Sequence, residues 1–421
     1  MKILFIHQNF PGQYKNLAPA LVARGDTCVA LTLRVKEPTT WKGVRVFPYQ
    51  IRRAPKQDVH PWLIDFNTKL HRAEACLAEA EKLKRSGFEP DVIVAHPGWG
   101  ESMFLRDVWP KARIGLYYEL FYQAKAGDAG FDPEFAKTES VGDLQRIRIK
   151  NMNNHLHFPL GDSGICPTEF QASSFPKPFR DRISVIHDGI DTTVSKPNPE
   201  VSFELDNGEV LTRDDQVISF VNRNLEPYRG FHVFMRALPQ MLKDAPKARV
   251  IIVGGDGRSY GAAAPDGKSW KEIFVDEVRP QISDGDWARV HFVGKLPYDK
   301  FLALLQLTSV HVYLTYPFVL SWSLLESMSC GAAIVASDTA PVQEAITDGV
   351  TGQLVDFFDA AGLAEATIKL LQDNDRRAAY GQAARQHVID TYDLEKICLP
   401  RQLDWIDALY KKEAGPSDPH H

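Results

Sequence analysis

The chain has 421 residues, of which 44% are hydrophobic and 24% charged, proportions typical of a folded globular protein. They exclude a disordered chain, a collagen-like repeat and a coiled coil, and the length predicts two domains, each with its own core. The formal net charge of −5, without a long run of Lys and Arg, gives no reason to expect a nucleic-acid partner.

The five cysteines are far apart and form no Cys-x-x-Cys pair, which predicts buried free thiols. The apolar run at the N-terminus is too short for a secretory signal, and no later stretch reaches the roughly 18 to 20 apolar residues of a membrane span. We therefore expect a cytoplasmic protein and leave open a peripheral contact with the inner face of the membrane. The polar tail, residues 413–421, is left out of the expected fold.

Over residues 1–190, short aliphatic or β-branched runs alternate with longer amphipathic stretches. This alternation predicts βαβ units around a parallel sheet and hence a first α/β domain. The strands are expected at residues 2–7, 27–33, 44–48, 91–96, 114–118 and 183–186, and the helices at 14–24, 62–84 and 144–156.

A polar stretch rich in Asp, Asn and Pro then predicts a linker at residues 191–215. The alternation restarts over 216–392, which predicts a second domain of the same architecture, and a last helix at 393–412 is expected to pack back on the first domain. The strands are expected at 217–221, 249–253, 290–293, 310–314 and 333–337, and the helices at 230–243, 298–307, 323–329 and 363–372.

Two doubly wound domains of this kind would face each other across a cleft. Ligands of such sheets bind outside the carboxyl ends of the strands, where the N–H groups of helix N-termini favour anions. The polar residues that follow the expected strands are therefore the candidate ligand contacts.

The first candidate is a turn after the strand 217–221. Arg223 and Arg229 flank Pro227 in this turn, and the turn ends at Gly230. The two arginines could converge on one anion, because a planar guanidinium binds phosphate through two parallel hydrogen bonds. A solvated basic loop is the alternative.

The second candidate follows the strand 310–314 and reads as a loop that opens a helix. Backbone N–H groups at Ser321, Trp322 and Ser323 could receive a diphosphate. Glu326 lies one turn inside the helix and could hold two ribose hydroxyls, while a surface glutamate is disfavoured by the apolar residues around it.

With these motifs the chain resembles the family-4 retaining glycosyltransferases of the GT-B fold over nearly its whole length. The resemblance rests on the arginine pair, on Glu326 with the following Cys330-Gly331, and on the glycine segments at 254–257 and 293–296. It implies two doubly wound Rossmann-like domains facing a central cleft, with the basic pair on the donor diphosphate and Glu326 on the ribose. It also assigns Gly255 and Lys295 to donor binding.

One position departs from the family pattern. The family usually carries a second glutamate eight residues before the ribose-binding one, where it contacts the transferred sugar, and this chain has Phe318 there. The contact with the donor sugar is therefore expected to differ, through relaxed choice at one hydroxyl or through a donor that lacks a polar group.

In the first domain, two segments directly after predicted strands are candidates for ligand contacts on the other side of the cleft. The resemblance places Gly12 against the donor phosphates, and it places Glu119 near the position where many relatives carry a histidine facing the reacting sugar. A tight turn without a ligand and a structural glutamate are the alternatives. The acceptor-side candidates are Gln8, Phe10, His96 and Trp99.

We therefore expect a metal-independent enzyme that transfers a sugar from a nucleotide diphosphate-sugar to an acceptor hydroxyl, with retention of the anomeric configuration. Arg223 and Arg229 would stabilise the departing diphosphate, and Glu119 would orient rather than bond covalently. No cofactor is expected. The acceptor is expected to be a sugar, a lipid-linked molecule or a small molecule in glycan, polysaccharide or glycolipid biosynthesis, and the base and the sugar are not identified. The alternatives are a nucleotide-sugar epimerase and a catalytically silent binding protein.

Overall fold

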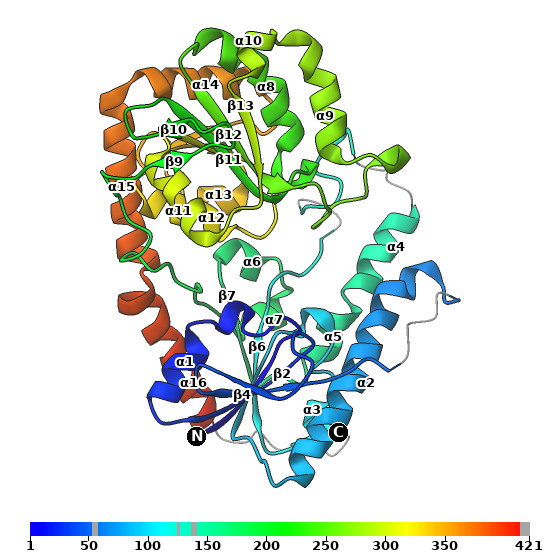
Figure 1. Cartoon of the computed structure of the whole chain (residues 1–421). Helices are drawn as coiled ribbons and strands as arrows, with labels where there is room; N and C mark the ends of the chain where they lie inside the picture. The colour runs from blue at the N-terminus through cyan, green and yellow to red at the C-terminus, as the bar shows by residue number, and fades with distance from the viewer. Residues whose placement is uncertain (53–57, 124–126, 136–140, 413–421) are drawn as a thin grey trace. The chain divides into compact units, whose positions relative to one another are not determined.

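The computed structural model describes residues 1–52, 58–123, 127–135 and 141–412. The described chain divides into two compact units. The first contains residues 1–52, 58–123, 141–188 and 395–412, and the second contains residues 127–135 and 189–394. Each unit is built on a parallel sheet with helices on both of its faces (Figure 1), so the predicted pair of doubly wound α/β domains is confirmed.

The sheet of the first unit has the order β3-β4-β2-β1-β5-β6-β7-β8 and is parallel except for the pairing of β3 with β4. The chain builds the sheet outward in one direction from β1 and in the other direction from β5. The strand order therefore reverses between β1 and β5. The strands are β1 (Lys2–Ile6), β2 (Thr27–Thr32), β3 (Thr39–Trp41), β4 (Val44–Pro48), β5 (Val92–Ala95), β6 (Arg113–Tyr117), β7 (Ser163–Cys166) and β8 (Ile183–Val185).

Alternating side chains of these strands feed two hydrophobic cores, because successive residues of a strand point to opposite faces. Leu4 and Ile6 belong to the core on one face, and Ile3 and Phe5 to the core on the other. The helical segments are η1 (Gly12–Tyr14), α1 (Leu17–Ala23), η2 (Pro61–Leu63), α2 (Ile64–Arg85), η3 (Pro97–Trp99), α3 (Leu105–Val108), α4 (Val141–Lys150), α5 (Met152–His157), α6 (Glu169–Ser173), α7 (Lys177–Arg180) and α16 (Leu399–Lys411).

The sheet of the second unit is wholly parallel, with the order β13-β12-β11-β14-β15-β16. In chain order this is 3-2-1-4-5-6, the order of dinucleotide-binding sheets, and it reverses between β11 and β14. The strands are β11 (Val217–Asn224), β12 (Arg249–Gly255), β13 (Val290–Gly294), β14 (Val310–Tyr313), β15 (Ala333–Ser337) and β16 (Gln353–Val355), with a separate hairpin of β9 (Phe203–Glu204) and β10 (Val210–Leu211).

The helices of this unit also cover both faces of its sheet. Helices α8, α9 and α14 share one core with strand residues such as Ile218 and Phe220, whereas Val217 and Val221 point into the core beneath α11. The helical segments are η4 (Pro227–Arg229), α8 (Phe231–Asp244), η5 (Pro265–Gly267), α9 (Trp270–Val278), η6 (Arg279–Gln281), α10 (Asp284–Trp287), α11 (Tyr298–Leu307), α12 (Trp322–Ser329), α13 (Ala340–Gln343), α14 (Ala360–Gln372), α15 (Asn374–Tyr392) and a π-helical turn, η7 (Leu394–Cys398).

The predicted linker and the last helix each pack on one of the two units. The stretch assigned to a linker carries the β9–β10 hairpin, whose Phe203 and Leu211 are buried in the second unit. The last helix, α16, packs on the first unit, where Trp405, Ile406 and Leu409 lie in the core. All five cysteines are buried and free, which confirms that prediction. Among the described helices, none combines the length and the apolar character needed to cross a bilayer.

Candidate functional site

A pocket of about 460 Å³ lies in the second unit at the carboxyl ends of its strands. Its walls come from the ends of β11, β12 and β13 and from the start of α12, so it lies where the strand order reverses, the usual ligand position in this kind of sheet. The lining residues are Val221, Asn222, Arg223, Asn224, Glu226, Arg229, Val253, Tyr260, Lys295, Leu296, Phe301, Ser321 and Ser323. They carry three cations and one carboxylate, so the pocket favours an anion.

Arg229 is buried and held from several sides. Its Nη1 donates to the Thr315 hydroxyl at 2.7 Å and to the Tyr313 hydroxyl at 3.2 Å, and its Nη2 donates to the Val319 carbonyl at 3.0 Å. The ring of Tyr260 lies 5.2 Å from the guanidinium carbon. Three of the five N–H donors are thus used to fix the side chain, and a preorganised cation remains at the edge of the pocket.

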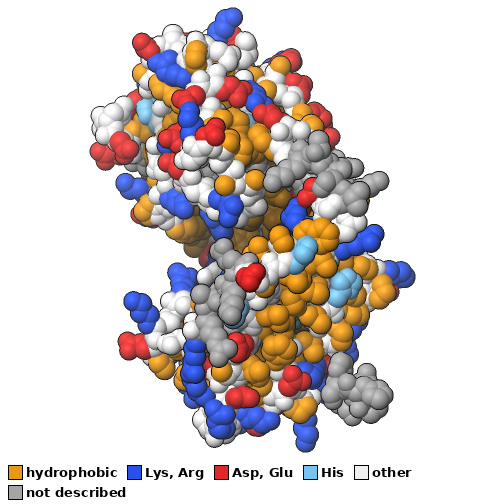
Figure 2. All heavy atoms as spheres, turned by 90° about the vertical axis from the view of Figure 1, so that its right-hand side faces the viewer, with side chains coloured by type: hydrophobic (Ala, Val, Ile, Leu, Met, Phe, Trp, Pro, Cys, Tyr) orange, Lys and Arg blue, Asp and Glu red, His pale blue; other side chains and the backbone are white. Residues whose placement is uncertain are grey.

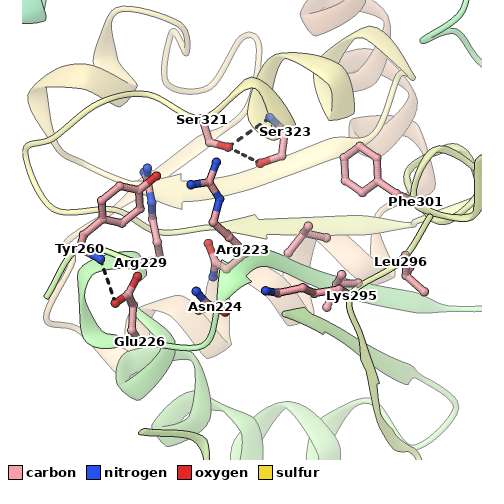
Figure 3. Close-up of a pocket in the computed structure, with 13 residues that line it drawn as sticks. Arg223, Asn224, Glu226, Arg229, Tyr260, Lys295, Leu296, Phe301, Ser321 and Ser323 are labelled. Carbon is pink, nitrogen blue, oxygen red and sulfur yellow. Dashed lines mark hydrogen bonds between the residues drawn. The ribbon is translucent and has the colours of Figure 1, made fainter. Parts of the chain in front are cut away.

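The other two cations are more open. Arg223 is exposed at the end of β11, and its guanidinium points toward Ser321 and Ser323 (Figure 3). Lys295 follows β13, and Gly255 makes room for it: a Cβ atom at Gly255 would lie 2.6 Å from the Lys295 Cε. Gly255 therefore lets the lysine chain pass close to the backbone at the end of β12.

The start of α12 supplies hydroxyl groups to the same pocket. The Ser321 side chain caps the helix by accepting from the Ser323 amide at 3.3 Å, and the Ser321 amide donates to the Tyr313 hydroxyl at 3.0 Å. Two of the amides expected to bind a diphosphate therefore have partners within the chain. The positive end of the helix dipole and the hydroxyls of Ser321 and Ser323 still face the pocket.

Three other predicted donor residues lie beside the pocket rather than among its lining residues. Glu326 is half-buried on α12, and its Oε1 accepts from the Tyr298 hydroxyl at 2.9 Å. Trp322 is half-buried and packs against the core beneath α12. Phe318 is 8% exposed, and its ring lies 5.9 Å from the Arg229 guanidinium carbon.

The pocket also contains polar residues that the sequence analysis did not single out. The Asn222 Nδ2, the Asn224 Oδ1 and the Glu226 Oε1 are buried without a hydrogen-bond partner in the described structure. The other oxygen of Glu226 accepts from the amides of Ser259 and Tyr260 at 3.2 and 3.3 Å, which fixes the loop after β12. All three residues lie in the same segment as Arg223. The run of polar residues in that segment was the sequence signal that could have predicted them as pocket residues.

In the first unit, two buried histidines, His7 and His96, and the half-buried Trp99 form an aromatic cluster at the carboxyl ends of β1 and β5. The His96 ring stacks on Trp99 with 4.1 Å between centroids, and the His7 ring meets Trp99 edge-on at 4.8 Å. Burial lowers the pKa of His7 to about 4 and lowers the pKa of His96 as well. Both imidazoles are therefore neutral near pH 7. His7 was not predicted, although it directly follows the first strand.

Glu119 stands at this cluster, because its Oε2 lies 3.8 Å from the His96 Nε2. Gly12 also reaches it: the backbone at Gly12 has φ +48°, and a Cβ there would lie 2.4 Å from the His7 ring. The structure thus brings Gly12, His96, Trp99 and Glu119 together in one unit.

The two remaining acceptor-side candidates differ from each other. Phe10 is 4% exposed and belongs to the core beneath α1, so its ring is structural in this unit. Gln8 is half-buried, and its carbonyl accepts from the Thr32 hydroxyl at 2.8 Å.

Two Rossmann-like units, one with a cationic pocket at its switch point, are the architecture of the GT-B fold. Residues 24–195 match the glycosyl transferase family 4 group, and residues 202–387 match the glycosyl transferases group 1. The chain belongs to the family-4, group 1 glycosyltransferases.

A curated relative and two solved structures are similar to the chain. Alpha-maltose-1-phosphate synthase from Mycolicibacterium smegmatis is 31% identical over 52% of this chain and 55% of its own length, so the chain spans about half of that relative. Sucrose-phosphate synthase from Thermosynechococcus elongatus has a TM-score of 0.74 at 17% identity, over 98% of this chain and 100% of that one. HepE from Anabaena, in complex with UDP and glucose, has a TM-score of 0.65 at 16% identity, over 97% and 100%. At these identities the two structures support the fold alone.

Proposed function

We propose that the protein transfers a glycosyl unit from a nucleoside diphosphate sugar to an acceptor hydroxyl, with retention of the anomeric configuration. The observation that carries the proposal is the convergence of Arg223, at the end of β11, Arg229, in the turn that follows it, and Lys295, directly after β13, on one pocket at the switch point of the second unit. A diphosphate is the anion whose charge and size suit three cations and a helix N-terminus.

The pocket supplies electrostatic stabilisation of the leaving group. As the bond between the sugar and the diphosphate breaks, negative charge grows on the phosphate oxygens, and cations already fixed in place stabilise it without reorganising. Arg229, held by Tyr313, Thr315 and Val319, fits this role best. The three cations also offer a way to balance the diphosphate without a metal ion.

A covalent carboxylate nucleophile has little support in this pocket. Glu226 is its one lining carboxylate, and one of its oxygens is held by backbone amides of the loop after β12. This favours the front-face attack that the family resemblance implies, in which the leaving phosphate takes the acceptor proton. Glu119 and the neutral His96 are assigned to orienting the acceptor.

Uridine nucleotides are the first probes, because the similar structure of HepE contains UDP and glucose. Isothermal titration of UDP into the wild-type protein should show binding, and Lys295→Ala and Arg223→Ala should each weaken it about tenfold or more, the scale of a lost charge-assisted contact. Arg376→Ala, at an exposed arginine on α15, is the matched control. Incubation with UDP-glucose and mixed sugar acceptors then tests transfer.

The results separate the proposed function from its rivals. Binding of several nucleoside diphosphates with no transfer or hydrolysis of any sugar donor would identify a silent binding protein. Equal affinity of the wild type and both pocket variants would refute the diphosphate assignment.

We also propose that the first unit contacts an anionic membrane surface. A broad apolar area covers part of this unit, in the lower half of Figure 2. Neighbouring segments η2, α2, α4 and α5 expose Leu63, Ile64, Leu144 and Leu156 by 38, 46, 37 and 47%. Arg146 and Arg148 on α4 are also exposed, and apolar groups flanked by arginines bind an anionic lipid interface.

Co-sedimentation with vesicles containing phosphatidylglycerol should capture the wild-type protein and lose Leu144→Glu. Val210→Glu, at an exposed apolar residue of the second unit, is the control. Equal capture of both variants would contradict this placement of the membrane contact.

A further inference from the structure

Residues 127–135, here called the strap, pack within the second unit although they come from the first half of the chain. The described residues before and after them, up to 123 and from 141, belong to the first unit. The strap is acidic, and its Asp128 and Asp132 are buried at 6 and 3% exposure. Phe131 and Phe135 lie against the core of the second unit. A buried carboxylate is stable only if neighbouring groups hydrogen-bond to it or balance its charge. The partners of Asp128 and Asp132 therefore show which residues hold the strap in place.

The two buried aspartates each bind a tyrosine hydroxyl. Asp128 accepts from the Tyr228 hydroxyl, and the Asp132 Oδ2 accepts from the Tyr316 hydroxyl at 2.8 Å. Bonds from a hydroxyl to an ionised carboxylate are among the stronger hydrogen bonds in proteins. The strap therefore fixes the outer ends of both tyrosines.

A histidine and an arginine of α8 complete the docking of the strap. The His232 Nε2 lies 3.0 Å from the Asp132 Oδ2, and Arg236 donates to both oxygens of Glu134 at 2.7 and 2.8 Å. Burial alone would raise the pKa of Asp132, but the bonds from His232 and Tyr316 outweigh it and hold that pKa below its usual range.

Metal binding is the alternative role for this cluster of side chains. Asp132, Glu134 and His232 offer ligand atoms within 4.8 Å of one another. The Arg236 guanidinium, however, already engages both oxygens of Glu134 and supplies the positive charge that a metal would bring. The cluster is therefore satisfied as an ion-pair network.

The two tyrosines held by the strap stand beside the cationic pocket. Tyr228 immediately precedes Arg229, and its carbonyl accepts from the Tyr316 amide at 3.0 Å. The Tyr228 ring lies 4.7 Å from the ring of Tyr316 and 5.4 Å from that of Phe318, between centroids. Phe318 in turn lies next to the Arg229 guanidinium, so the strap, the tyrosine pair and the arginine form one continuous set of contacts.

We propose that the strap is a positioning element for the donor site: Asp128 and Asp132 hold Tyr228 and Tyr316, and these tyrosines set the turn that carries Arg229. None of the strap residues is among those that line the pocket. This inference rests on the proposed function for the identity of the ligand, and on the contacts alone for the link from the strap to the arginine turn.

Four proteins test the link between Asp128 and Tyr228: the wild type, Asp128→Ala, Tyr228→Phe and the double variant, each titrated with UDP. Each single variant should weaken UDP about tenfold, the scale of a hydrogen bond to a charged group. The double variant should be no weaker than either single one, because both remove the same bond. Asp128→Asn, which keeps an acceptor oxygen, should restore most of the affinity, and Asp284→Ala, at an exposed aspartate of α10, is the control.

Two further measurements separate positioning from general destabilisation. With an active donor, Asp128→Ala should lower kcat as well as raise KM, because Arg229 is assigned to the departing diphosphate, and Asp128→Asn should recover most of both. Hydrogen exchange of residues 226–231 and 316–321 should quicken in Asp128→Ala while the rest of the second unit keeps its protection.

The exchange measurement needs no ligand, so it stands even if the wild type binds no nucleotide and the proposed function fails. Unchanged exchange in both segments, or UDP affinities that fall additively in the double variant, would overturn the positioning role.

Discussion

The two arginines of the pocket should respond differently to replacement by alanine, because Arg223 is exposed and Arg229 is buried. Arg223→Ala removes a charge from an exposed position, so the free energy of unfolding should change by less than about 0.5 kcal/mol. Arg229→Ala leaves the Thr315 hydroxyl and the Val319 carbonyl without their donor. A buried group that loses its partner costs about 1 to 3 kcal/mol, and water entering the vacated space offsets part of this, so we expect a loss of about 2 to 4 kcal/mol.

The effect on turnover should be large in both variants. Each arginine is assigned to the departing diphosphate, and removing one preorganised donor of this kind slows an enzyme about ten- to a thousandfold. Arg223→Ala is therefore the cleaner test, since its loss of activity cannot be attributed to unfolding. Arg229→Ala must be assayed well below its own Tm.

Urea unfolding gives the stabilities, and kcat with an active donor gives the turnover, with Arg376→Ala as the control for loss of a surface arginine. The reasoning is refuted if Arg223→Ala keeps wild-type kcat and UDP affinity, or if Arg229→Ala loses activity only in proportion to its unfolded fraction.

Four other outcomes follow from the same structure. Glu326→Gln should raise the KM for the donor more than it lowers kcat, because a ribose contact acts in the ground and transition states alike; Glu365→Gln on α14 is the control, and an unchanged KM removes Glu326 from the site. Gly12→Ala forces a Cβ to 2.4 Å from the His7 ring at φ +48°, so urea unfolding should show a loss of about 1 to 2 kcal/mol. Because the pKa of His7 is about 4 in the folded state and about 6.5 when unfolded, the unfolded chain binds the proton first as pH falls. The contribution of neutral His7 to the free energy of unfolding, fully present above pH 6.5, should therefore fall by about 1 to 2 kcal/mol between pH 7 and pH 5. A His7→Gln variant should lack this part of the pH dependence of stability. Phe318→Glu should reduce transfer from the natural donor, as measured by initial rates.

Much of the fold could be predicted because its strands and helices carry strong local patterns. The strand at 44–48 and the helix at 298–307 end at the predicted residues. Helix α15 was missed, since two of its four buried residues, Gly381 and Ala384, are small and its apolar stripe is weak. A Cβ at Gly381 would lie 2.2 Å from the Gly331 carbonyl oxygen, so this helix packs by close backbone approach.

The candidate site was partly predictable for a related reason. Parallel strands bring their carboxyl ends to one edge, so the motif after β11 and the segment after β14 were expected to meet, and Arg223, Arg229, Ser321 and Ser323 do line one pocket. Their functional roles stay predictions. The docking of the strap was beyond sequence reasoning, because the partners of Asp128 and Asp132 lie about a hundred or more residues away along the chain.

Phe318 is the position where the chain departs from its family, and its surroundings explain why a carboxylate there should be harmful. The ring is 8% exposed, lies 5.0 Å from the ring of Tyr260 between centroids, and lies 5.9 Å from the Arg229 guanidinium carbon. A glutamate would reach the same guanidinium and pair with it, and this pair would compete with the donor diphosphate for the cation.

Phe318→Gln separates this competition from the loss of the ring, because the amide has a similar reach without the charge. We expect Phe318→Glu to weaken UDP more than Phe318→Gln does, and the difference to shrink in high salt. A phenyl ring also makes no hydrogen bond to a sugar hydroxyl, so the wild type should accept donors that differ at one hydroxyl, or prefer a deoxy sugar. Higher activity in Phe318→Glu, or a strict requirement for every ring hydroxyl of the donor, would show that this account of Phe318 is wrong.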